Sequence, residues 1–331
     1  MKCLCCGKEI LEKASLQEQE TQWHSSCVRK FFGTASLPEL DISEDTLTRI
    51  ATESTNKGFT VPGVQKKMSL HLTAGGGRPR LTLVDYPTGY ILKPQTEKFE
   101  ALPEAEYLVM QMAQKTGIAT VPFALIRTAG ANATMAYITK RIDRVLPTKK
   151  DPALKLLAME DFCQLEQRLT ENKYKGSYER CAKVVSRYSV QPGLDLSELF
   201  LRVVFSFVIG NSDMHLKNFS MIETLAGSQR YVLSDAYDLL PVNVILPEDV
   251  EQLALTVNGK KQNIRRKDFL KFAEVSEISR DAAAKMIQKI ISMKETYLRM
   301  CEGSYLPGHL KDRLCLLIED RTKALERGNE R

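Results

Sequence analysis

Residues 210–219 read GNSDMHLKNF and place side chains of several chemical kinds directly after an apolar run. Asp213 can accept a proton from a hydroxyl group, which is the task of a general base. Asn218, five residues later, and Asp238, after a short predicted strand, carry oxygen atoms of the kind that bind Mg²⁺. A base followed by two oxygen ligands is the set of groups that phosphoryl transfer requires. The alternative interpretation is an ordinary Asx-rich turn after a helix.

Two further segments fit the same chemistry. TVPGVQKKMS, residues 60–69, predicts a glycine-containing loop ahead of a strand, and such a loop can cover phosphate groups. Lys93 ends a predicted strand, from which its ammonium group can reach those phosphates. The spacing of Asp213 and Asn218, followed by Asp238, has the order of a protein-kinase catalytic loop and metal-binding Asp. No GxxxxGK[ST] segment occurs, which argues against a P-loop NTPase.

The first 27 residues hold a second candidate site. Cys3 and Cys6 form a CxxC pair, and His24 and Cys27 form an HxxC pair. Two short-spaced pairs separated by a loop can supply the four ligands of a tetrahedral zinc ion, so the pattern predicts a structural zinc knuckle without an open catalytic position. Cys5 could replace Cys6 as a ligand. The alternative to zinc is a set of reduced cysteines that bind no metal.

The composition is that of a globular protein, with 43% hydrophobic and 27% charged residues in a chain of 331. This length predicts two domains or lobes. No window approaches the roughly 18 apolar residues of a membrane span, and no signal-peptide core is visible, so we expect a cytoplasmic protein without a membrane partner. The scattered cysteines fit a reducing compartment. The net charge of +6, without interleaved aromatic residues or a dense basic face, does not predict a nucleic-acid-binding module.

The first half of the chain is predicted to be rich in strands. Residues 28–60 are polar and indicate one or two short helices, with LPELDIS (37–43) as a break. Residues 67–93 contain three strand-like runs between turn signals, which predicts a three-stranded antiparallel meander. A helix with Gly117 as its C-cap follows, and then two strands at VPFALIRTA and TMAYITKRID.

The second half is predicted to be mainly helical. The clearest helix is DLSELFLRVVFSFVIG, where Asp195 and Glu198 fit an N-terminal capping pattern and Gly210 a stop signal. RYVLSDAYDLLPV predicts a short strand and a turn. The expected fold class is α+β, two-lobed and protein-kinase-like. Its predicted parts are a zinc-knuckle module (1–35), a strand-rich N-lobe (36–145) and a helical C-lobe (146–331).

Seven stretches of the sequence resemble the HipA-like serine/threonine kinases of bacterial toxin–antitoxin systems. They are VPGVQKKMSL, YILKP, AEYLVMQMAQKTGI, KRIDR, MEDFCQL, VIGNSDMHLKNFS and AYDLLP, in family order. Full-length members carry a longer part ahead of the phosphate loop than residues 1–59 of this chain. The chain is therefore similar to the short toxin kinases of tripartite systems, in which a separate small protein supplies the N-terminal subdomain.

The resemblance implies a role for each residue at a motif position. Asp213 looks like the catalytic Asp, and His215 like the loop His that supports it. Asn218 and Asp238 look like the magnesium ligands, and Lys93 like the Lys that contacts the ATP phosphates. The phosphate loop and the strand that lines the adenine are matched by Gly63, Val64, Gln65, Lys140 and Arg141.

Thr60 lies where the family has an inhibitory autophosphorylated Ser, so the resemblance implies an ATP- and Mg-dependent kinase that limits its own activity. It implies a protein substrate from translation, such as an aminoacyl-tRNA synthetase. It also implies two partners, a small N-subdomain-like protein and a DNA-binding antitoxin through which DNA is met only indirectly. Two alternatives keep the fold: an ATP-binding pseudokinase or regulator, and a small-molecule phosphotransferase.

Overall fold

The computed structural model describes residues 1–40, 42, 67–73, 78–83, 88–128, 133–147, 151 and 153–326. The chain divides into two compact units. Unit 1 contains Met1–Tyr107 and Val121–Leu154, and unit 2 contains Leu108–Thr120 and Lys155–Arg331, so the division falls within helix α4 (Leu102–Thr116). Among the described helices, none combines the length and the apolar character needed to cross a membrane.

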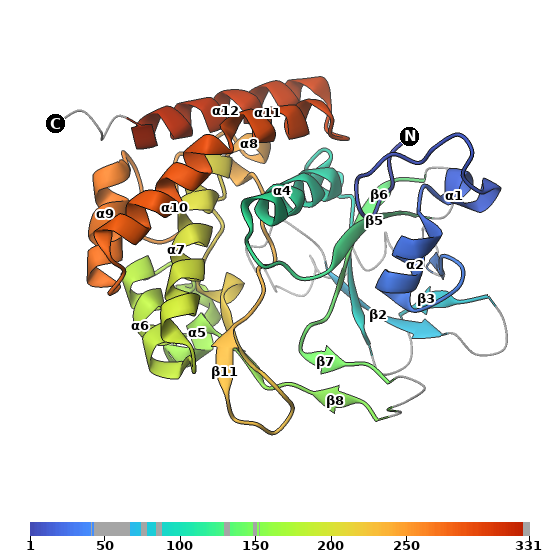
Figure 1. Ribbon diagram of the computed structural model, residues 1–331, viewed down its shortest axis with the longest axis horizontal. Helices are drawn as coiled ribbons and strands as arrows, with labels where there is room; N and C mark the ends of the chain where they lie inside the picture. The colour runs from blue at the N-terminus through green and yellow to red at the C-terminus, as the bar shows by residue number, and fades with distance from the viewer. Residues whose placement is uncertain are drawn as a thin grey trace. The chain divides into compact units, whose positions relative to one another are not determined.

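Unit 1 is built on a six-stranded sheet (Figure 1). The strands are β1 (Glu39–Leu40), β2 (Met68–Thr73), β3 (Arg80–Thr82), β4 (Tyr90–Pro94), β5 (Phe123–Arg127) and β6 (Met135–Lys140). Their order in the sheet is β1-β3-β2-β4-β6-β5, and all neighbours are antiparallel except β1 and β3. β5 and β6 confirm the two strands predicted after the helix.

The predicted meander is wrong in its strand order. β2 pairs with both β3 and β4, so the first of the three strands is the central one. β3 has three residues, of which Leu81 alone is buried, whereas β2 and β4 bury several side chains. A short strand with one buried residue gains little from a central position, which explains why β3 lies farther out. The LPELDIS segment, predicted as a break, supplies β1, which extends the sheet beside β3.

The N-terminal segment packs onto the same sheet. It contains α1 (Leu16–Thr21) and α2 (Ser25–Phe32), drawn in blue in Figure 1. The amide of Leu125 in β5 donates to the carbonyl of Leu4 at 2.9 Å, and the indole of the buried Trp23 donates to the carbonyl of Leu125 at 3.2 Å. Since β5 is the last strand in the sheet order, the N-terminal segment covers backbone groups that β6 leaves unpaired.

Helix α4 ends where the sequence predicts. Gly117 follows its last residue with φ 86°, a left-handed conformation that favours glycine. Unit 1 also contains β7 (Arg144–Val145), and β8 (Lys155–Leu156) opens the second part of unit 2.

Unit 2 is mainly helical, as predicted, and carries a small antiparallel sheet. The strands β9 (Met159–Asp161), β10 (Ser220–Glu223) and β11 (Tyr231–Leu233) lie in the order β11-β10-β9. The helices are α5 (Phe162–Leu165), η1 (Thr170–Asn172), α6 (Tyr178–Tyr188), α7 (Pro192–Ile209), η2 (Leu216–Asn218), α8 (Val242–Ile245), α9 (Arg266–Val275), α10 (Arg280–Ser292), α11 (Lys294–Glu302) and α12 (Gly308–Glu326). Every residue from Leu199 to Ile209 of α7 is buried, so α7 is the core helix of this unit.

The predicted start of α7 is wrong by four residues, since Asp195 was expected at the N-cap. The helix begins at Pro192, whose fixed φ suits the first helical turn, and Gln191 is the N-cap. Asp195 is not the cap. Its carboxylate accepts hydrogen bonds from the Ser189 hydroxyl at 2.6 Å and from the amide of Leu233 at 2.7 Å. Asp195 therefore ties the core helix to β11, the strand that leads to Asp238.

Candidate active site

The GNSDMHLKNF segment begins where the buried helix α7 stops. Gly210 has φ 73°, and the next amide, of Asn211, donates back to the carbonyl of Ser206 at 2.8 Å. A Cβ atom at Gly210 would lie 2.9 Å from the side chain of Leu317. The left-handed backbone and this close approach both require glycine at position 210. The direction in which the chain leaves the end of α7 is therefore fixed.

The turn brings Asp213 and Asn218 together. The Asn218 side-chain nitrogen donates to the backbone carbonyl of Asp213 at 2.8 Å, and the Asp213 amide is held at 3.2 Å by the side-chain oxygen of Asn211. Asn218 is buried, whereas 25% of the Asp213 side chain is exposed. Since the amide nitrogen of Asn218 is occupied, its oxygen is the atom left to bind a cation.

His215 is buried beside Asp213, and its ring does not hydrogen-bond to Oδ1 of the Asp213 carboxylate. The distance from His215 Nε2 to Asp213 Oδ1 is 3.9 Å, which is too long. The amide of His215 donates to the carbonyl of Asp213 at 2.8 Å, and its carbonyl accepts from the amide of Asn218 at 2.9 Å. His215 therefore holds the shape of the turn through its backbone, in keeping with a supporting role.

Asp238 is attached to the same turn through its neighbour Tyr237. The hydroxyl of Tyr237 donates to the carbonyl of Lys217 at 3.2 Å and lies 2.6 Å from the hydroxyl of Ser220. Lys217 and Ser220 stand on either side of Asn218 in the chain, so Tyr237 connects the segment before Asp238 to both. Asp238 has φ 57°, a left-handed conformation that is uncommon outside glycine.

Lys93 of unit 1 is buried and paired with a residue that the sequence did not single out. Its ammonium nitrogen lies 2.5 Å from Oε1 of Glu106 in α4, and the two residues are 1% and 0% exposed. The ammonium also lies 5.1 Å from the ring centroid of Tyr137. Glu106 belongs to the AEYLV motif, and an acidic residue inside an apolar helix is the signal that could have identified it.

Lys140 and Arg141 both have partners within unit 1. The ammonium of Lys140 lies 5.6 Å from the ring centroid of Phe31 in α2, and burial lowers the pKa of Lys140. Arg141 forms two hydrogen bonds to the carboxylate of Asp143, at 3.0 and 2.7 Å. The adenine contacts implied for both side chains stay predictions. Thr60, Gly63, Val64 and Gln65 lie outside the described residues, so their assignment to a phosphate loop also stays a prediction.

The four predicted zinc ligands come together. One ligand atom each from Cys3, Cys6, His24 and Cys27 lies within 4.8 Å of the others. Nδ1 of His24 is 3.4 Å from Sγ of Cys6 and 4.0 Å from Sγ of Cys27. Ligand atoms around a tetrahedral zinc ion, with bonds of about 2.0–2.3 Å, are roughly 3.5–3.8 Å apart, so the cluster has the right size.

The orientation of the His24 ring also suits a metal. Its other nitrogen, Nε2, lies 3.2 Å from the backbone carbonyl of Glu9. A carbonyl can only accept a hydrogen bond, so Nε2 carries the proton and the lone pair of Nδ1 points toward the cysteines. The chain makes a tight turn around the CxxC pair of Cys3 and Cys6. In this turn the amide of Gly7, with φ 70°, donates to the carbonyl of Cys3 at 2.8 Å.

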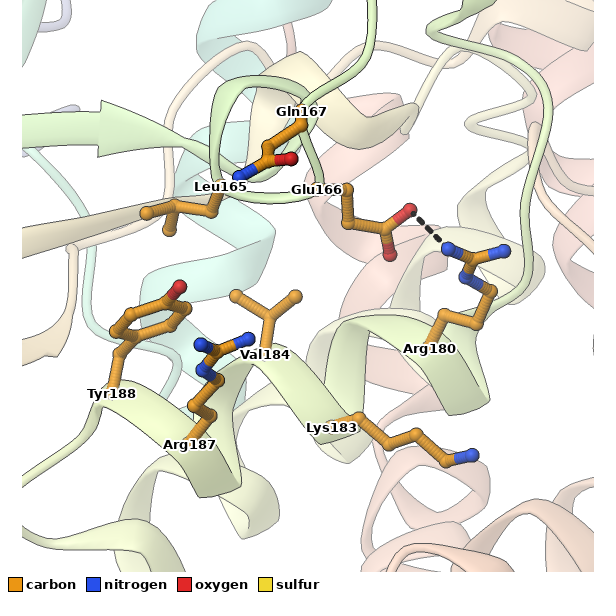
Figure 2. Close-up of a pocket in the computed structure, with 8 residues that line it drawn as sticks. All are labelled: Leu165, Glu166, Gln167, Arg180, Lys183, Val184, Arg187 and Tyr188. Carbon is orange, nitrogen blue, oxygen red and sulfur yellow. Dashed lines mark ion pairs between the residues drawn. The ribbon is translucent and has the colours of Figure 1, made fainter.

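A pocket of about 360 Å³ lies in unit 2 and is lined by none of the predicted site residues (Figure 2). Its walls are the turn after α5 and one face of α6. The lining residues are Leu165, Glu166, Gln167, Arg180, Lys183, Val184, Arg187 and Tyr188. Glu166 pairs with Arg180 at 3.3 Å across the pocket and with Arg168 at 2.7 Å.

The described elements define an α+β protein with a strand-rich first unit and a helical second unit. The chain belongs to the family described as HipA-like C-terminal domain, which matches residues 59–297. A chain in the structure of the Shewanella oneidensis MR-1 toxin–antitoxin complex of HipA, HipB and operator DNA has the same fold. It aligns with a TM-score of 0.66 and 15% identity over 91% of this chain and 78% of that chain. The predicted family and fold class are therefore confirmed.

Two curated relatives carry related names. "Putative kinase Y4mE" of Sinorhizobium fredii is 27% identical over 254 residues, which cover 74% of this chain and 58% of that protein. A "Putative kinase" of Haemophilus influenzae is 24% identical over 292 residues, which cover 82% of both proteins. This chain thus spans little more than half the length of the first relative, and most of the length of the second.

Proposed function

We propose that the protein is an ATP-dependent protein kinase that phosphorylates serine or threonine hydroxyl groups. The observation that carries this proposal is the turn after α7, in which a hydrogen bond of 2.8 Å joins Asn218 to Asp213. Membership of the HipA-like family and the names of the curated relatives support the same activity.

In this mechanism Asp213 is the general base. Its partly exposed carboxylate accepts the proton of the substrate hydroxyl while the hydroxyl oxygen bonds to the γ-phosphorus of ATP and the bond to the β-phosphate oxygen breaks. The products are a phosphorylated side chain and ADP. The backbone contacts within the turn fix Asp213 before the substrate arrives, so little reorganisation is required during the reaction.

Asn218 and Asp238 would hold Mg²⁺, since an amide oxygen and a carboxylate are the hard ligands that this ion prefers. When bound, the ion neutralises negative charge on the phosphates. Lys93 would contact the phosphates from unit 1, and Glu106 orients its ammonium group at 2.5 Å. A protein kinase requires a Lys–Glu ion pair in addition to its metal-binding Asp, and this buried pair would be that ion pair.

The alternatives differ in what they predict for Asp213. A pseudokinase or regulator would bind ATP without using the carboxylate as a base. A small-molecule phosphotransferase would use the same residues, and only identification of the acceptor separates it from a protein kinase. Because the sequence retains the general base and both oxygen ligands, we favour the protein kinase over the pseudokinase.

We further propose that this kinase is the toxin of a type II toxin–antitoxin system that acts on a translation component. The fold neighbour in complex with HipB and operator DNA supports a DNA-binding antitoxin as one partner. A small protein that resembles an N-terminal subdomain would be the other partner, and an aminoacyl-tRNA synthetase is the substrate class to examine first. These activities belong in the cytoplasm.

Phosphoproteomics of cells that express the wild type or Asp213→Asn tests the proposal. The substitution keeps the shape of the turn and removes the base, so phosphoryl transfer and growth inhibition should fall by about 100-fold or more. Asp238→Asn should also abolish phosphoryl transfer, and it should weaken ATP–Mg binding more than Asp213→Asn does. Asp235→Asn, which changes an exposed carboxylate nearby, is the matched control. Undiminished transfer in Asp213→Asn would contradict the proposal. The same spectra reveal whether Thr60 carries phosphate in the wild type alone.

We also propose that Cys3, Cys6, His24 and Cys27 hold one structural zinc ion. The size of the cluster and the direction of the His24 lone pair support it. Four protein ligands leave no open position, so the ion would stabilise the N-terminal segment and take no part in the reaction.

A further inference from the structure

The segment Lys173–Tyr178, which follows η1, runs along the catalytic turn. The amide of Leu216 donates to the carbonyl of Lys173 at 3.2 Å, and the hydroxyl of Tyr178 donates to the carbonyl of Met214 at 2.9 Å. These two bonds hold the backbone of the turn on the C-terminal side of Asp213.

Tyr174, within this segment, contacts the proposed base directly. Its hydroxyl donates a hydrogen bond to Oδ1 of Asp213, and its ring meets the ring of His215 edge-on with 5.0 Å between centroids. Burial raises the pKa of Tyr174, and the negative charge of Asp213 raises it further. The phenol therefore keeps its proton at neutral pH and acts as the donor to the carboxylate.

Other contacts hold the segment independently of the turn. The carbonyl of Lys175 accepts a hydrogen bond from Arg168, which in turn pairs with Glu166 of the pocket in Figure 2 at 2.7 Å. The amide of Tyr178 donates to the carbonyl of Thr256 at 3.0 Å, and the amide of Thr256 donates to the carbonyl of Gly176 at 3.3 Å. The backbone that follows Tyr174 is thus held by hydrogen bonds to residues outside the turn. The Tyr174 hydroxyl therefore has a defined position relative to Asp213.

We propose that Tyr174 is a positioning residue for phosphoryl transfer, which holds Oδ1 of Asp213 so that Oδ2 can accept the proton of the substrate hydroxyl. The inference rests on the proposed kinase function and deepens it. A carboxylate can rotate about its last side-chain bond, and a charge-assisted hydrogen bond to one oxygen removes that freedom.

Tyr174→Phe tests the inference because it removes the hydroxyl and keeps the ring against His215. We expect kcat to fall by about 10- to 100-fold, since small misplacements of a catalytic group have effects of this order. KM for ATP–Mg should stay within about twofold, because the variant leaves both oxygen ligands intact. Tyr231→Phe, which removes a hydroxyl from β11 of the same unit, is the matched control.

A second variant separates an effect through Asp213 from a general effect on the fold. In the double variant Tyr174→Phe/Asp213→Asn, the residual rate should equal that of Asp213→Asn, because residues that act as a unit are not additive. A further fall in the double variant would show an action independent of Asp213 and would overturn the inference.

The remaining outcomes distinguish this inference from the proposed function. If Asp213→Asn loses activity while Tyr174→Phe keeps the wild-type kcat, the kinase stands and the positioning role is wrong. If Tyr174→Phe raises kcat, its hydroxyl competes with the substrate for Asp213, and the positioning role is again wrong. If the wild type transfers no phosphoryl group to any acceptor, the proposed function itself fails and the inference fails with it.

Discussion

The two units hold their charged functional side chains in opposite ways. In unit 1, Lys93 and Glu106 are both withdrawn from solvent and form an ion pair of 2.5 Å. In unit 2, Asp213 keeps 25% of its side chain exposed, accepts hydrogen bonds from Asn218 and Tyr174, and donates one through its amide to Asn211. A buried ion pair resists separation because an unpaired buried charge is strongly unfavourable in free energy. The turn is held instead by several hydrogen bonds, each of which contributes only modestly to stability.

This difference predicts what substitution will do in each unit. Removal of one partner of the buried pair should reduce stability and activity together, because the remaining charge is left in an apolar environment. Removal of a group from the turn should reduce activity with a much smaller effect on stability, because solvent can satisfy the exposed carboxylate. Unit 1 also depends on its N-terminal segment, which supplies backbone partners to β5.

The largest expected effect is that of zinc removal on unit 1. Structural zinc contributes on the order of 10 kcal/mol to the folding of small modules, so a chelator should unfold the N-terminal segment. The amides of Leu4 and Leu125 should then exchange hydrogen rapidly, while α7 of unit 2 keeps its protection. Purified protein should carry about one zinc ion, since the site has four ligands.

The sequence left open whether Cys5 or Cys6 is a zinc ligand. The matched variants Cys5→Ser and Cys6→Ser distinguish these two possibilities. Because Cys6 belongs to the cluster, its substitution should abolish zinc binding, while Cys5→Ser should retain the ion. Protein prepared without a chelator that contains no zinc would contradict the site altogether. Retention of zinc by Cys6→Ser together with its loss in Cys5→Ser would reverse the assignment.

Glu106→Gln should have the next largest effect. It leaves the Lys93 ammonium buried without its carboxylate, which typically costs about 3–5 kcal/mol of unfolding free energy. Denaturant titration measures the loss, and Glu97→Gln, on the exposed turn ahead of α4, is the control. The double variant Lys93→Met/Glu106→Leu should recover most of the stability and remain inactive. A loss below about 1 kcal/mol in Glu106→Gln would show that the pair is not held by burial as argued.

The smallest effect concerns Asp268, a buried carboxylate of unit 2. Burial alone raises the pKa of Asp268, but hydrogen bonds from Lys260 (2.8 Å), Asn258 (2.8 Å) and the amide of Arg265 (2.9 Å) outweigh it and lower the pKa overall. A lowered folded pKa contributes stability above the unfolded value, about 3.9, and this contribution disappears as the pH falls through the folded pKa.

The pH dependence of unfolding in the wild type and Asp268→Asn measures this contribution. We expect Asp268→Asn to lose about 1.5–3 kcal/mol at pH 7, and the difference between the two proteins to shrink below about pH 4. A difference that is independent of pH between 3 and 7, roughly the range where Asp titrates, would show that the charge of Asp268 contributes nothing.

Several elements could be predicted because their signals are local. Gly117 and Gly210 end helices with a left-handed backbone, which neighbouring residues in the chain already indicate. The strand order around β2 could not be read in this way. Alternation of apolar and polar residues identifies a strand but does not say which neighbour the strand pairs with. The short β3 buries one side chain, and β2 instead lies between β3 and β4.

The start of α7 shows the same limit. Asp195 followed by Glu198 has the spacing of a capping pattern, yet the carboxylate of Asp195 bonds instead to the amide of Leu233, 38 residues later. A carboxylate can accept either kind of donor. Which donor it meets depends on where β11 packs, and Pro192 had already provided a favourable helix start.

The sequence by itself determined the groups that are close in the chain, namely Asp213 with Asn218 and the CxxC and HxxC pairs. Chain connectivity limits how far residues three to five positions apart can separate, so their spacing alone brings them to one place. Only the tertiary structure decided that Glu106 pairs with Lys93, that Tyr174 bonds to Asp213, and that the carbonyl of Glu9 sets which nitrogen of His24 faces the cysteines. Each of these contacts joins residues far enough apart for the chain to allow many partners, and packing of the surrounding apolar side chains selects one of them.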